Sequence, residues 1–402
     1  MAVPPWPQAK MKTSRAQVED MWAHHSTEWR HSEQVASQWR EASAIDPRLL
    51  RSRTTGDWWG VLDELKLTLL VTREYEHLVM AASAPNGRPR CSFFPTPHPS
   101  GLAVDRETRR VFLASTRNPN QVFILKPVTS ALNRLDMESV KLEGSPLIPT
   151  SSAYYPGSLY IHDLGLVDGR LYANAAGHNA VVRLEPDGNF KHVWWPRCVE
   201  AKGKPVFGRN HIQLNSIAAG KSIEESFFTA SSTRLERLRP GHLNYPVDGR
   251  GVVISGRNRE PVCSGLTRPH SARLWKGNVW LANSGYGQLG MVCDGRFEVF
   301  KQLPGWTRGL CIVGHVAFIG TSRVIPKYAG YAPGLNPAAS RCAVHAICTK
   351  TGRILGAMEW PLGNQIFAID WIGNKVTSGF IFEVGVRNRK RELSIFYSYL
   401  NN

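Results

Sequence analysis

Six polar or aromatic residues of this chain stand in the same local setting, each at the head of a short phrase that continues into an apolar run. A neutral imidazole binds transition metals and readily moves protons near neutral pH. Amide and indole side chains orient ligands through hydrogen bonds. These positions are candidates for a site, provided that the fold brings them together. The six heads are His98, His162, Gln213, His270, Trp306 and Gln365.

The repetition of this phrase predicts the fold. The heads lie 36 to 64 residues apart, and each phrase is followed by a turn such as VDGR or WKGN and a second apolar run such as VWLANSG. A propeller blade takes about 40 to 50 residues, and loop insertions account for the longer intervals. We expect an all-β, six-bladed β-propeller in which a hairpin over residues 65–83 completes the last blade and closes the ring. A β-sandwich, the alternative, would not explain the sixfold return of the phrase.

Residues 1–60 differ from the rest of the chain in their residue pattern, with Trp, His, Glu and Arg at mixed spacing and no strand-like alternation. They predict a partly helical N-terminal extension, with a helix over residues 15–43 that begins after Thr13 or Ser14. A histidine cluster in this segment, at residues 24, 25 and 31, is more typical of the polar face of a helix than of a metal site. We therefore divide the chain into an extension, residues 1–60, and a propeller, residues 61–402.

The innermost strand of each blade lines the channel of a propeller, so the six heads would converge there. Burying such side chains costs free energy unless they are paired, solvated or bound to a ligand. Polar residues where a structural strand would carry Val, Ile or Leu therefore point to function. Neighbouring positions add further polar side chains, which are Asp163, His211, Asn215, Ser271, Thr307 and Arg308.

Three interpretations of this ring remain open. In the first, histidines bind a divalent transition metal (Fe, Zn, Cu or Mn), and Asp163 is a ligand or orients an imidazole. In the second, no metal is needed: Arg308 grips a carboxylate or phosphate while His162 moves protons. In the third, the polar ring contacts only the water of the channel. The histidines of the metal interpretation are His98, His162, His211 and His270.

Charge and composition limit the partners of the chain. Its formal charge is +17, but the basic residues are scattered apart from a short run at residues 387–391. We expect a surface that favours small anionic ligands rather than nucleic acid. No apolar run approaches 18 residues and the N-terminus has no signal-peptide core, so we expect a cytoplasmic protein without a membrane partner. No phosphate-binding glycine motif supports a nucleotide cofactor, and the seven cysteines form no CxxC pair.

Several segments resemble an uncharacterised bacterial family of propeller proteins that is known only as a domain of unknown function. The resemblance covers residues 95–382 and rests on segments such as YIHDLGLVDGRLYANAAGHNAVVRLEPDG, HIQLNSIA, RPHSARLWKGNVWLANSGYGQLGMV and GWTRGLCIVGHVAFIGTSR. More distantly, the architecture is similar to gluconolactonase-like and strictosidine-synthase-like propellers, which hold a metal or substrate on the channel axis. The resemblance implies a polar set made of His162, Asp163, His211, Asn215, His270 and Arg308.

We therefore expect an enzyme that acts on a small polar or anionic substrate, or on a peptide, at the mouth of the channel. His162 and His270 are expected to be metal ligands or acid–base groups, Asp163 to orient an imidazole, and Arg308 to bind an anionic group. Hydrolysis, lyase or isomerase chemistry and metal-dependent oxidation all suit such a ring. The rival expectation is a non-catalytic propeller that binds a protein or glycan. The expected substrate contacts are Gln213, Asn215, Trp306, Thr307 and Gln365.

Overall fold

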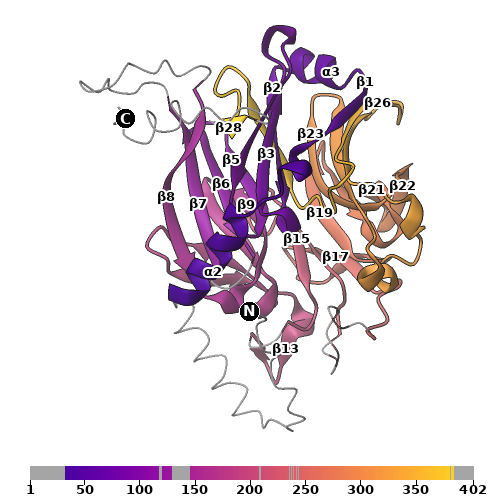
Figure 1. Ribbon diagram of the computed structural model, residues 1–402. Helices are drawn as coiled ribbons and strands as arrows, with labels where there is room; N and C mark the ends of the chain where they lie inside the picture. The colour runs from indigo at the N-terminus through magenta and orange to yellow at the C-terminus, as the bar shows by residue number, and fades with distance from the viewer. Residues whose placement is uncertain are drawn as a thin grey trace.

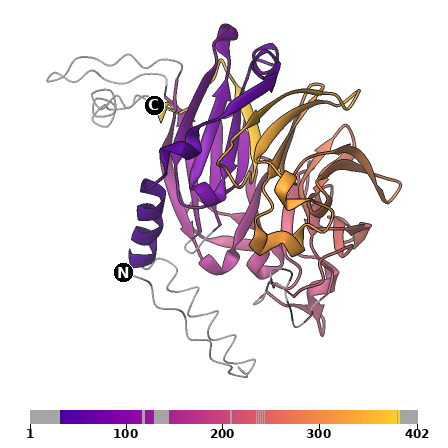
Figure 2. The ribbon, with the colours of Figure 1, turned by 45° about the vertical axis from the view of Figure 1, so that its right-hand side comes forward.

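The computed structural model describes residues 32–116, 120–128, 145–207, 210–234, 236, 238, 240, 242, 244–380 and 382–383. Six antiparallel sheets of four or five strands surround one axis (Figures 1 and 2), and a separate two-stranded sheet pairs β13 (Glu200–Ala201) with β14 (Lys204–Pro205). The innermost strands contact one another in a closed cycle, β5, β9, β15, β19, β23 and β27, with the last returning to the first. The chain is therefore a six-bladed β-propeller, and this prediction is confirmed.

Each blade has four meandering strands, numbered here in the order in which their innermost strands occur. The first blade is β5 (Pro99–Asp105), β6 (Arg110–Ser115), β7 (Asn120–Pro127) and β8 (Leu147–Tyr155). The second is β9 (Ile161–Val167), β10 (Arg170–Ala175), β11 (Ala180–Leu184) and β12 (Phe190–Trp194). The third is β15 (Leu214–Ala218), β16 (Phe227–Ala230), β17 (Gly251–Ser255) and β18 (Pro261–Leu266).

The remaining blades carry additions from the two ends of the chain. The fourth is β19 (Pro269–Trp275), β20 (Asn278–Asn283), β21 (Gln288–Cys293) and β22 (Arg296–Gln302). The fifth is β23 (Trp306–Val313), β24 (Val316–Ser322), β25 (Ala343–Cys348) and β26 (Ile354–Glu359), extended by β1 (Arg53–Gly56). The sixth is β27 (Ile369–Gly373), β2 (Leu67–Arg73), β3 (Leu78–Ser83), β4 (Arg90–Pro95) and β28 (Phe382–Glu383).

The sixth blade closes the ring as predicted from the hairpin over residues 65–83. Its innermost strand, β27, comes from the C-terminal part of the chain and pairs with β2 from the N-terminal part, with Asp370 opposite Leu70. The innermost strand and its neighbour thus lie some 300 residues apart in sequence, and their pairing holds the ring shut.

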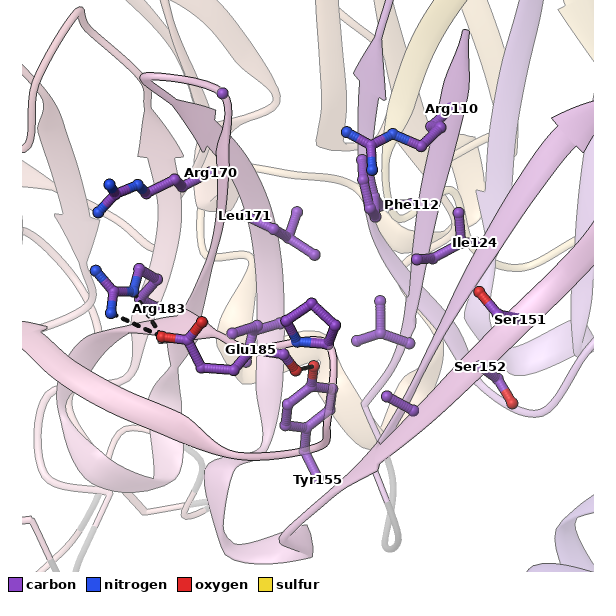
Figure 3. Close-up of a pocket in the computed structure, with 15 residues that line it drawn as sticks. Arg110, Phe112, Ile124, Ser151, Ser152, Tyr155, Arg170, Leu171, Arg183 and Glu185 are labelled. Carbon is purple, nitrogen blue, oxygen red and sulfur yellow. Dashed lines mark hydrogen bonds and ion pairs between the residues drawn. The ribbon is translucent and has the colours of Figure 1, made fainter. Parts of the chain in front are cut away.

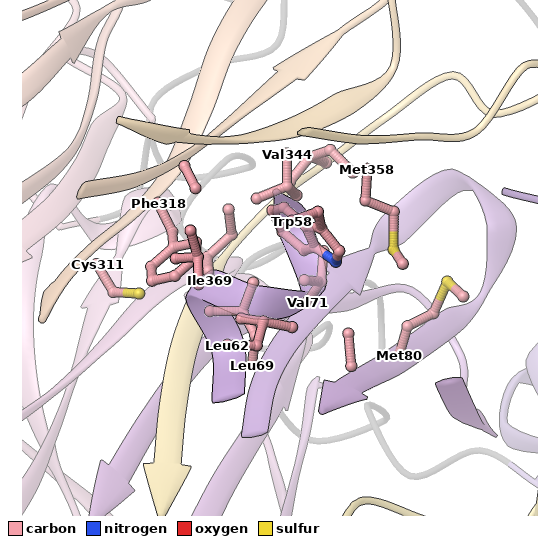
Figure 4. Close-up of a cluster of buried hydrophobic side chains, with 14 of the residues drawn as sticks. Trp58, Leu62, Leu69, Val71, Met80, Cys311, Phe318, Val344, Met358 and Ile369 are labelled. Atoms are coloured by element: carbon pink, nitrogen blue, oxygen red, sulfur yellow. The ribbon is translucent and has the colours of Figure 1, made fainter. Parts of the chain in front are cut away.

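Two helices precede the blades. The predicted N-terminal helix is confirmed over its described part, α2 (Ser32–Ser43), while residues 1–31 lie outside the described residues. Next, α3 (Trp58–Glu64) inserts Trp58 and Leu62 between the fifth and sixth blades, where Trp58 packs edge-on against Phe318 at 6.0 Å between ring centroids (Figure 4). The boundary drawn at residue 60 falls inside α3, and β1 before it already belongs to a blade sheet.

Burial follows from the position of a strand in its blade. An inner strand is covered on both faces by the neighbouring blades, so it is buried throughout, as in β24 (VAFIGTS), every residue of which is buried. An outer strand is covered less, and β22 (RFEVFKQ) has no buried residue. In the described part of the chain, no helix is both long and apolar enough to cross a membrane.

A β-bulge marks the start of the innermost strand in five of the blades. The register between this strand and the second strand shifts at corresponding places, for example between His270 and Arg273 in the fourth blade and between Arg308 and Leu310 in the fifth. Gly309, inside the second of these bulges, has a φ of +76°, and a Cβ there would lie 2.8 Å from Ile369. Bulges commonly re-aim side chains next to functional sites. These bulges adjoin the predicted heads of the phrases.

Candidate functional site

A cavity of about 170 Å³ lies at one mouth of the channel, where the innermost strands begin. Of the six predicted heads, five line this cavity: His162, Gln213, His270, Trp306 and Gln365. Each comes from the start of a different innermost strand or from the segment just before it. The remaining lining residues are Glu74, Tyr75, Tyr160, Asn210, Arg268, Arg308, Tyr331 and Phe367.

Two buried arginines give the cavity a positive charge. Arg268 is 2% exposed and Arg308 is 8% exposed. Burial lowers the pKa of each guanidinium to about 10, so both remain protonated at neutral pH. Among the described residues that line the cavity, Glu74 is the one acidic side chain. The lining therefore carries a surplus of positive charge when its histidines are neutral.

The two arginines differ in how they are held. Arg268 donates a hydrogen bond of 3.0 Å to Gln213 Oε1 and another to the carbonyl oxygen of Pro240, and its guanidinium lies 3.8 Å from the Tyr331 ring centroid. Arg308 lies over Phe367 at 3.3 Å. No carboxylate forms an ion pair with Arg308 among the described residues. Arg308 is thus a buried cation whose hydrogen-bonding capacity is left for a ligand or water.

His270 is held as a neutral base. Its Nδ1 lies 2.8 Å from the carbonyl oxygen of Arg268, which can only accept a hydrogen bond, so Nδ1 carries the proton and Nε2 keeps a lone pair. Ser284 Oγ lies 3.1 Å from the same nitrogen. Burial, together with the charge of Arg308, holds the pKa of His270 well below its usual value. The His162 ring stacks near it, with 6.4 Å between ring centroids.

Some polar atoms of the described lining are buried without a hydrogen bond. They include Trp306 Nε1, a donor, and Gln365 Oε1, an acceptor. Each such atom costs about 1–3 kcal/mol when it is left unsatisfied. A ligand that bears both an acceptor and a donor would recover this free energy.

The four histidines of the metal interpretation are not brought together. His162 and His270 line the cavity, but His98 and His211 do not. The two guanidinium groups beside His162 and His270 disfavour an additional cation at the same place. The channel residues therefore do not fit a metal ion.

His98 instead joins a separate cluster with Glu41 of α2 and His77. Glu41 Oε2 lies 3.7 Å from Nε2 of both histidines, and this cluster is the one group in the described part of the chain whose donor atoms are close enough to hold a metal. However, His77 Nδ1 accepts a hydrogen bond of 3.2 Å from the His98 amide, which places the proton of a neutral His77 on Nε2. A metal would have to displace that proton. The cluster adjoins the cavity, because His98 Nδ1 lies 3.6 Å from Oε1 of Glu74.

Two other predicted residues hold the blades together rather than line the cavity. Asp163 accepts hydrogen bonds from Arg273 Nη1 at 3.0 Å and from the amides of Leu164 and Ile217. Its carboxylate thus ties β9 to β15 and β19 and is not turned toward an imidazole of the cavity. Asn215 donates to Ser231 Oγ at 3.0 Å and to the carbonyl oxygen of Pro269 at 2.9 Å.

Thr307 and His211 also lie outside the lining. Thr307 is fully buried and donates its hydroxyl to the carbonyl oxygen of Gln288 at 3.2 Å. The His211 amide donates to Asn179 Oδ1 at 2.8 Å, while its neighbour Asn210 lines the cavity.

Sequence reasoning missed several lining residues, and some of them had a signal. Tyr160 and Arg268 stand two positions before His162 and His270, and Phe367 stands two positions after Gln365. Alternate residues of an extended segment share a face, so positions two apart from a head were candidates. Tyr75 and Tyr331 come from the short helices η2 (Glu74–Glu76) and η8 (Pro326–Tyr331), which lie outside the repeated phrase.

Comparison with solved structures places the chain among β-propellers. It is similar to a chain of the nidogen/laminin complex, with 10% identity, 78% of this chain and 99% of that chain covered, and a TM-score of 0.50. It is also similar to a gluconolactonase from Xanthomonas campestris (12% identity, 74% and 86% covered, TM-score 0.42). An aldose sugar dehydrogenase from Streptomyces coelicolor, solved with PQQ, is similar as well (15% identity, 77% and 98% covered, TM-score 0.43). At such identities the likeness shows the fold alone.

The sequence comparisons give a family but no activity. No curated protein matches this chain. A family model matches residues 56–380, which takes in all six innermost strands and the lining of the cavity. The chain therefore belongs to the family described as a domain of unknown function, DUF4915.

Proposed function

We propose that the cavity at the channel mouth is the active site of an enzyme that moves a proton on a small anionic substrate without a metal. One observation carries this proposal: Arg308, to which no described residue supplies an ion pair, and His270, a neutral histidine whose Nε2 keeps its lone pair, line the same small cavity. The first supplies a site for an anion and the second supplies a base. This is the metal-free interpretation of the ring, with His270 in place of His162 as the group that transfers the proton.

Substrate binding follows from the lining. The carboxylate or phosphate of the substrate accepts hydrogen bonds from Arg308, whose guanidinium is held in place by Phe367. Trp306 Nε1 and Gln365 Oε1 supply one donor and one acceptor for the rest of the molecule. A cavity of about 170 Å³ suits a small molecule better than a peptide.

Proton transfer follows from the tautomer of His270. Its Nε2 takes a proton from a carbon next to a carbonyl or carboxylate carbon of the substrate, and the electron pair of that C–H bond is delocalised onto the adjacent oxygen as an enolate. Arg308 stabilises the negative charge that develops. Return of the proton from the imidazolium to a neighbouring atom completes an isomerisation and restores the neutral base. Loss of a leaving group from the enolate would instead give a lyase.

The test of this proposal is proton exchange in D₂O, because exchange reports proton abstraction whatever the later steps are. A panel of 2-hydroxy acids, 2-oxo acids and sugar phosphates is followed by proton NMR with the purified chain. We expect one class to lose its α-proton signal. His270→Gln should abolish exchange and retain binding, and Arg308→Met should abolish binding by calorimetry. His315→Gln, which changes an exposed histidine, is the matched control.

The remaining outcomes count against the proposal. Binding of small anions without exchange in any class would support the rival function, a non-catalytic propeller. Exchange that survives His270→Gln would remove the assigned base. A panel that neither binds nor exchanges would leave the cavity as a water-filled channel and overturn the proposal altogether.

A further inference from the structure

Glu74 is a buried carboxylate of the channel cavity that the proposed reaction does not use. It belongs to η2, the short helix that joins β2 to β3 in the sixth blade. Among the described residues of the lining, it is the acidic one. Burial lowers the pKa of Arg308, and the negative charge of Glu74 partly offsets that effect. A carboxyl group therefore lies close to the proposed anion site, in the same small cavity.

The two carboxylates of η2 have different surroundings. Glu76 lies 3.6 Å from Arg73 Nη2 and accepts a hydrogen bond of 2.5 Å from the Asn364 amide. Glu76 thus holds the sixth blade together. Glu74 is turned to the cavity, and its Oε1 lies 3.6 Å from His98 Nδ1. Of these two side chains, Glu74 is the one that can meet a substrate.

His98 connects Glu74 with the surface. Its Nδ1 faces Glu74, and its Nε2 lies 3.7 Å from Glu41 Oε2. The side chains of Glu74, His98 and Glu41 are 6%, 16% and 63% exposed, so exposure rises from the cavity outward. Each gap closes to hydrogen-bond length with a shift of about 0.8 Å. Because an imidazole can release a proton from one nitrogen while it takes one up at the other, these side chains form a path for protons.

An anion bound at Arg308 brings a second negative charge close to Glu74. The cavity holds about 170 Å³, so the two charges cannot move far apart. Like charges in a buried site favour the protonated form of a carboxyl group. Binding of an anionic substrate should therefore convert Glu74 from a carboxylate into an acid.

We propose that Glu74 is the general acid of this site, and that it takes its proton from solvent through His98 and Glu41 when an anionic substrate binds. This role rests on the proposed function and adds a proton donor to it. His270 takes the α-proton, and the carboxyl group of Glu74 gives its proton to the enolate oxygen or to a leaving group.

The protons balance in both reactions. In an isomerisation, the neighbouring hydroxyl of the enediol returns a proton to Glu74. In a lyase, the leaving group keeps the proton, and His98 Nδ1 replaces it while Nε2 takes one from Glu41. Solvent then protonates Glu41, and the imidazolium of His270 releases its proton to solvent.

A carboxylate in a second concave site provides a matched control. The cleft between the first and second blades has a volume of about 640 Å³, and the acidic residue of its described lining is Glu185. Figure 3 shows this carboxylate joined to Arg183, whose Nη2 lies 2.7 Å away. The described linings of the two sites share no residue. Glu185→Gln thus removes a carboxylate from a concave site and leaves the channel cavity intact.

The experiment measures proton uptake when methanesulfonate, an anion that does not titrate, binds to the full chain at pH 8. Calorimetry in Tris and in triethanolamine, two amine buffers with different enthalpies of ionisation, gives the number of protons. We expect about one proton per bound anion. Infrared difference spectra should show the C=O stretch of a new carboxylic acid. This band is measured on the unsubstituted chain, so it does not depend on the folding of a variant.

Substitutions locate the proton and its path. Glu74→Gln should abolish the uptake and the infrared band while the anion still binds, whereas His270→Gln and Glu185→Gln should retain both. His98→Asn should keep the amount of uptake but slow it about tenfold or more in stopped-flow mixing with a pH indicator. Added imidazole should restore the rate. Thermal denaturation of each variant establishes that it is folded.

The contrary results are distinct from one another. Binding without proton uptake, or uptake that survives Glu74→Gln, would overturn the role of Glu74 and leave the proposed function standing. An unchanged rate in His98→Asn would remove His98 and Glu41 as the path. Absence of anion binding would overturn this inference together with the anion site at Arg308.

Discussion

Replacement of Arg308 by methionine should make the protein more stable while it removes anion binding. Burial lowers the pKa of this guanidinium from near 12.5 to about 10. At about 1.4 kcal/mol per pH unit, this shift corresponds to a free-energy cost of about 3 kcal/mol for burying the charged guanidinium. Stacking on Phe367 returns about 1 kcal/mol. Methionine fills a similar volume without a charge, so we expect a net gain of about 2 kcal/mol in the free energy of unfolding.

The assay is urea denaturation at pH 7, followed by tryptophan fluorescence. Arg273→Met is the matched comparison, because Arg273 also lies on an innermost strand and is partly buried, but it pairs with the buried Asp163 at 3.0 Å. Breaking that pair leaves a buried carboxylate without its partner and should cost about 3–5 kcal/mol. The two variants should therefore shift the urea midpoint in opposite directions. If Arg308→Met is destabilised as much as Arg273→Met, Arg308 is a structural residue and the reasoning for an anion site fails.

Three further predictions concern the pH dependence of stability, the packing of the core and the closure of the ring. Burial lowers the pKa of His345 to about 4, below the value near 6.5 of an unfolded chain, so its stabilising contribution is complete above pH 6.5 and is lost toward pH 4. Between pH 6.5 and pH 4, the free energy of unfolding of His345→Gln should fall by about 3 kcal/mol less than that of the unsubstituted chain. Urea denaturation at a series of pH values measures this difference, and an equal fall in both chains would contradict the prediction. Phe318→Ala, in a fully buried position against Trp58, should cost about 3–5 kcal/mol by urea denaturation, and a cost under 1 kcal/mol would mean that the space collapses. A chain that ends at residue 366 lacks β27 and should lose the cooperative thermal transition, whereas one that ends at residue 383 should keep it.

The fold was predictable because the blades of the propeller repeat one sequence pattern. Each blade buries its faces only against its neighbours, so every copy needs an apolar strand followed by a turn and a second strand, as in HSARLWKGNVWLANSG. Ring closure was also predictable from the sequence, because the hairpin over residues 65–83 precedes the first phrase and lacks an innermost strand of its own. The confirmed pairing of β27 with β2 supplies that strand.

The site was predictable only in part. Equivalent positions of a repeat converge on the axis, which is why five of the six heads line one cavity. The chemistry of that cavity was decided by tertiary contacts that no spacing encodes. The carbonyl oxygen of Arg268 fixes the tautomer of His270, and the partner of Asp163 turned out to be Arg273, from a strand more than 100 residues away.

His98 illustrates the limit most clearly. Its place at the head of the first phrase is a property of the sequence, and the sequence alone assigned it to the ring. In the folded chain its ring lies between Glu41 of α2 and Glu74 of η2, two elements outside the repeat. The sequence determined the six blades and the positions that meet at the axis, because repetition and apolar periodicity are local properties. Only the tertiary structure decided which side chains are paired, neutral or left for a ligand, because burial and charge depend on residues that are distant along the chain.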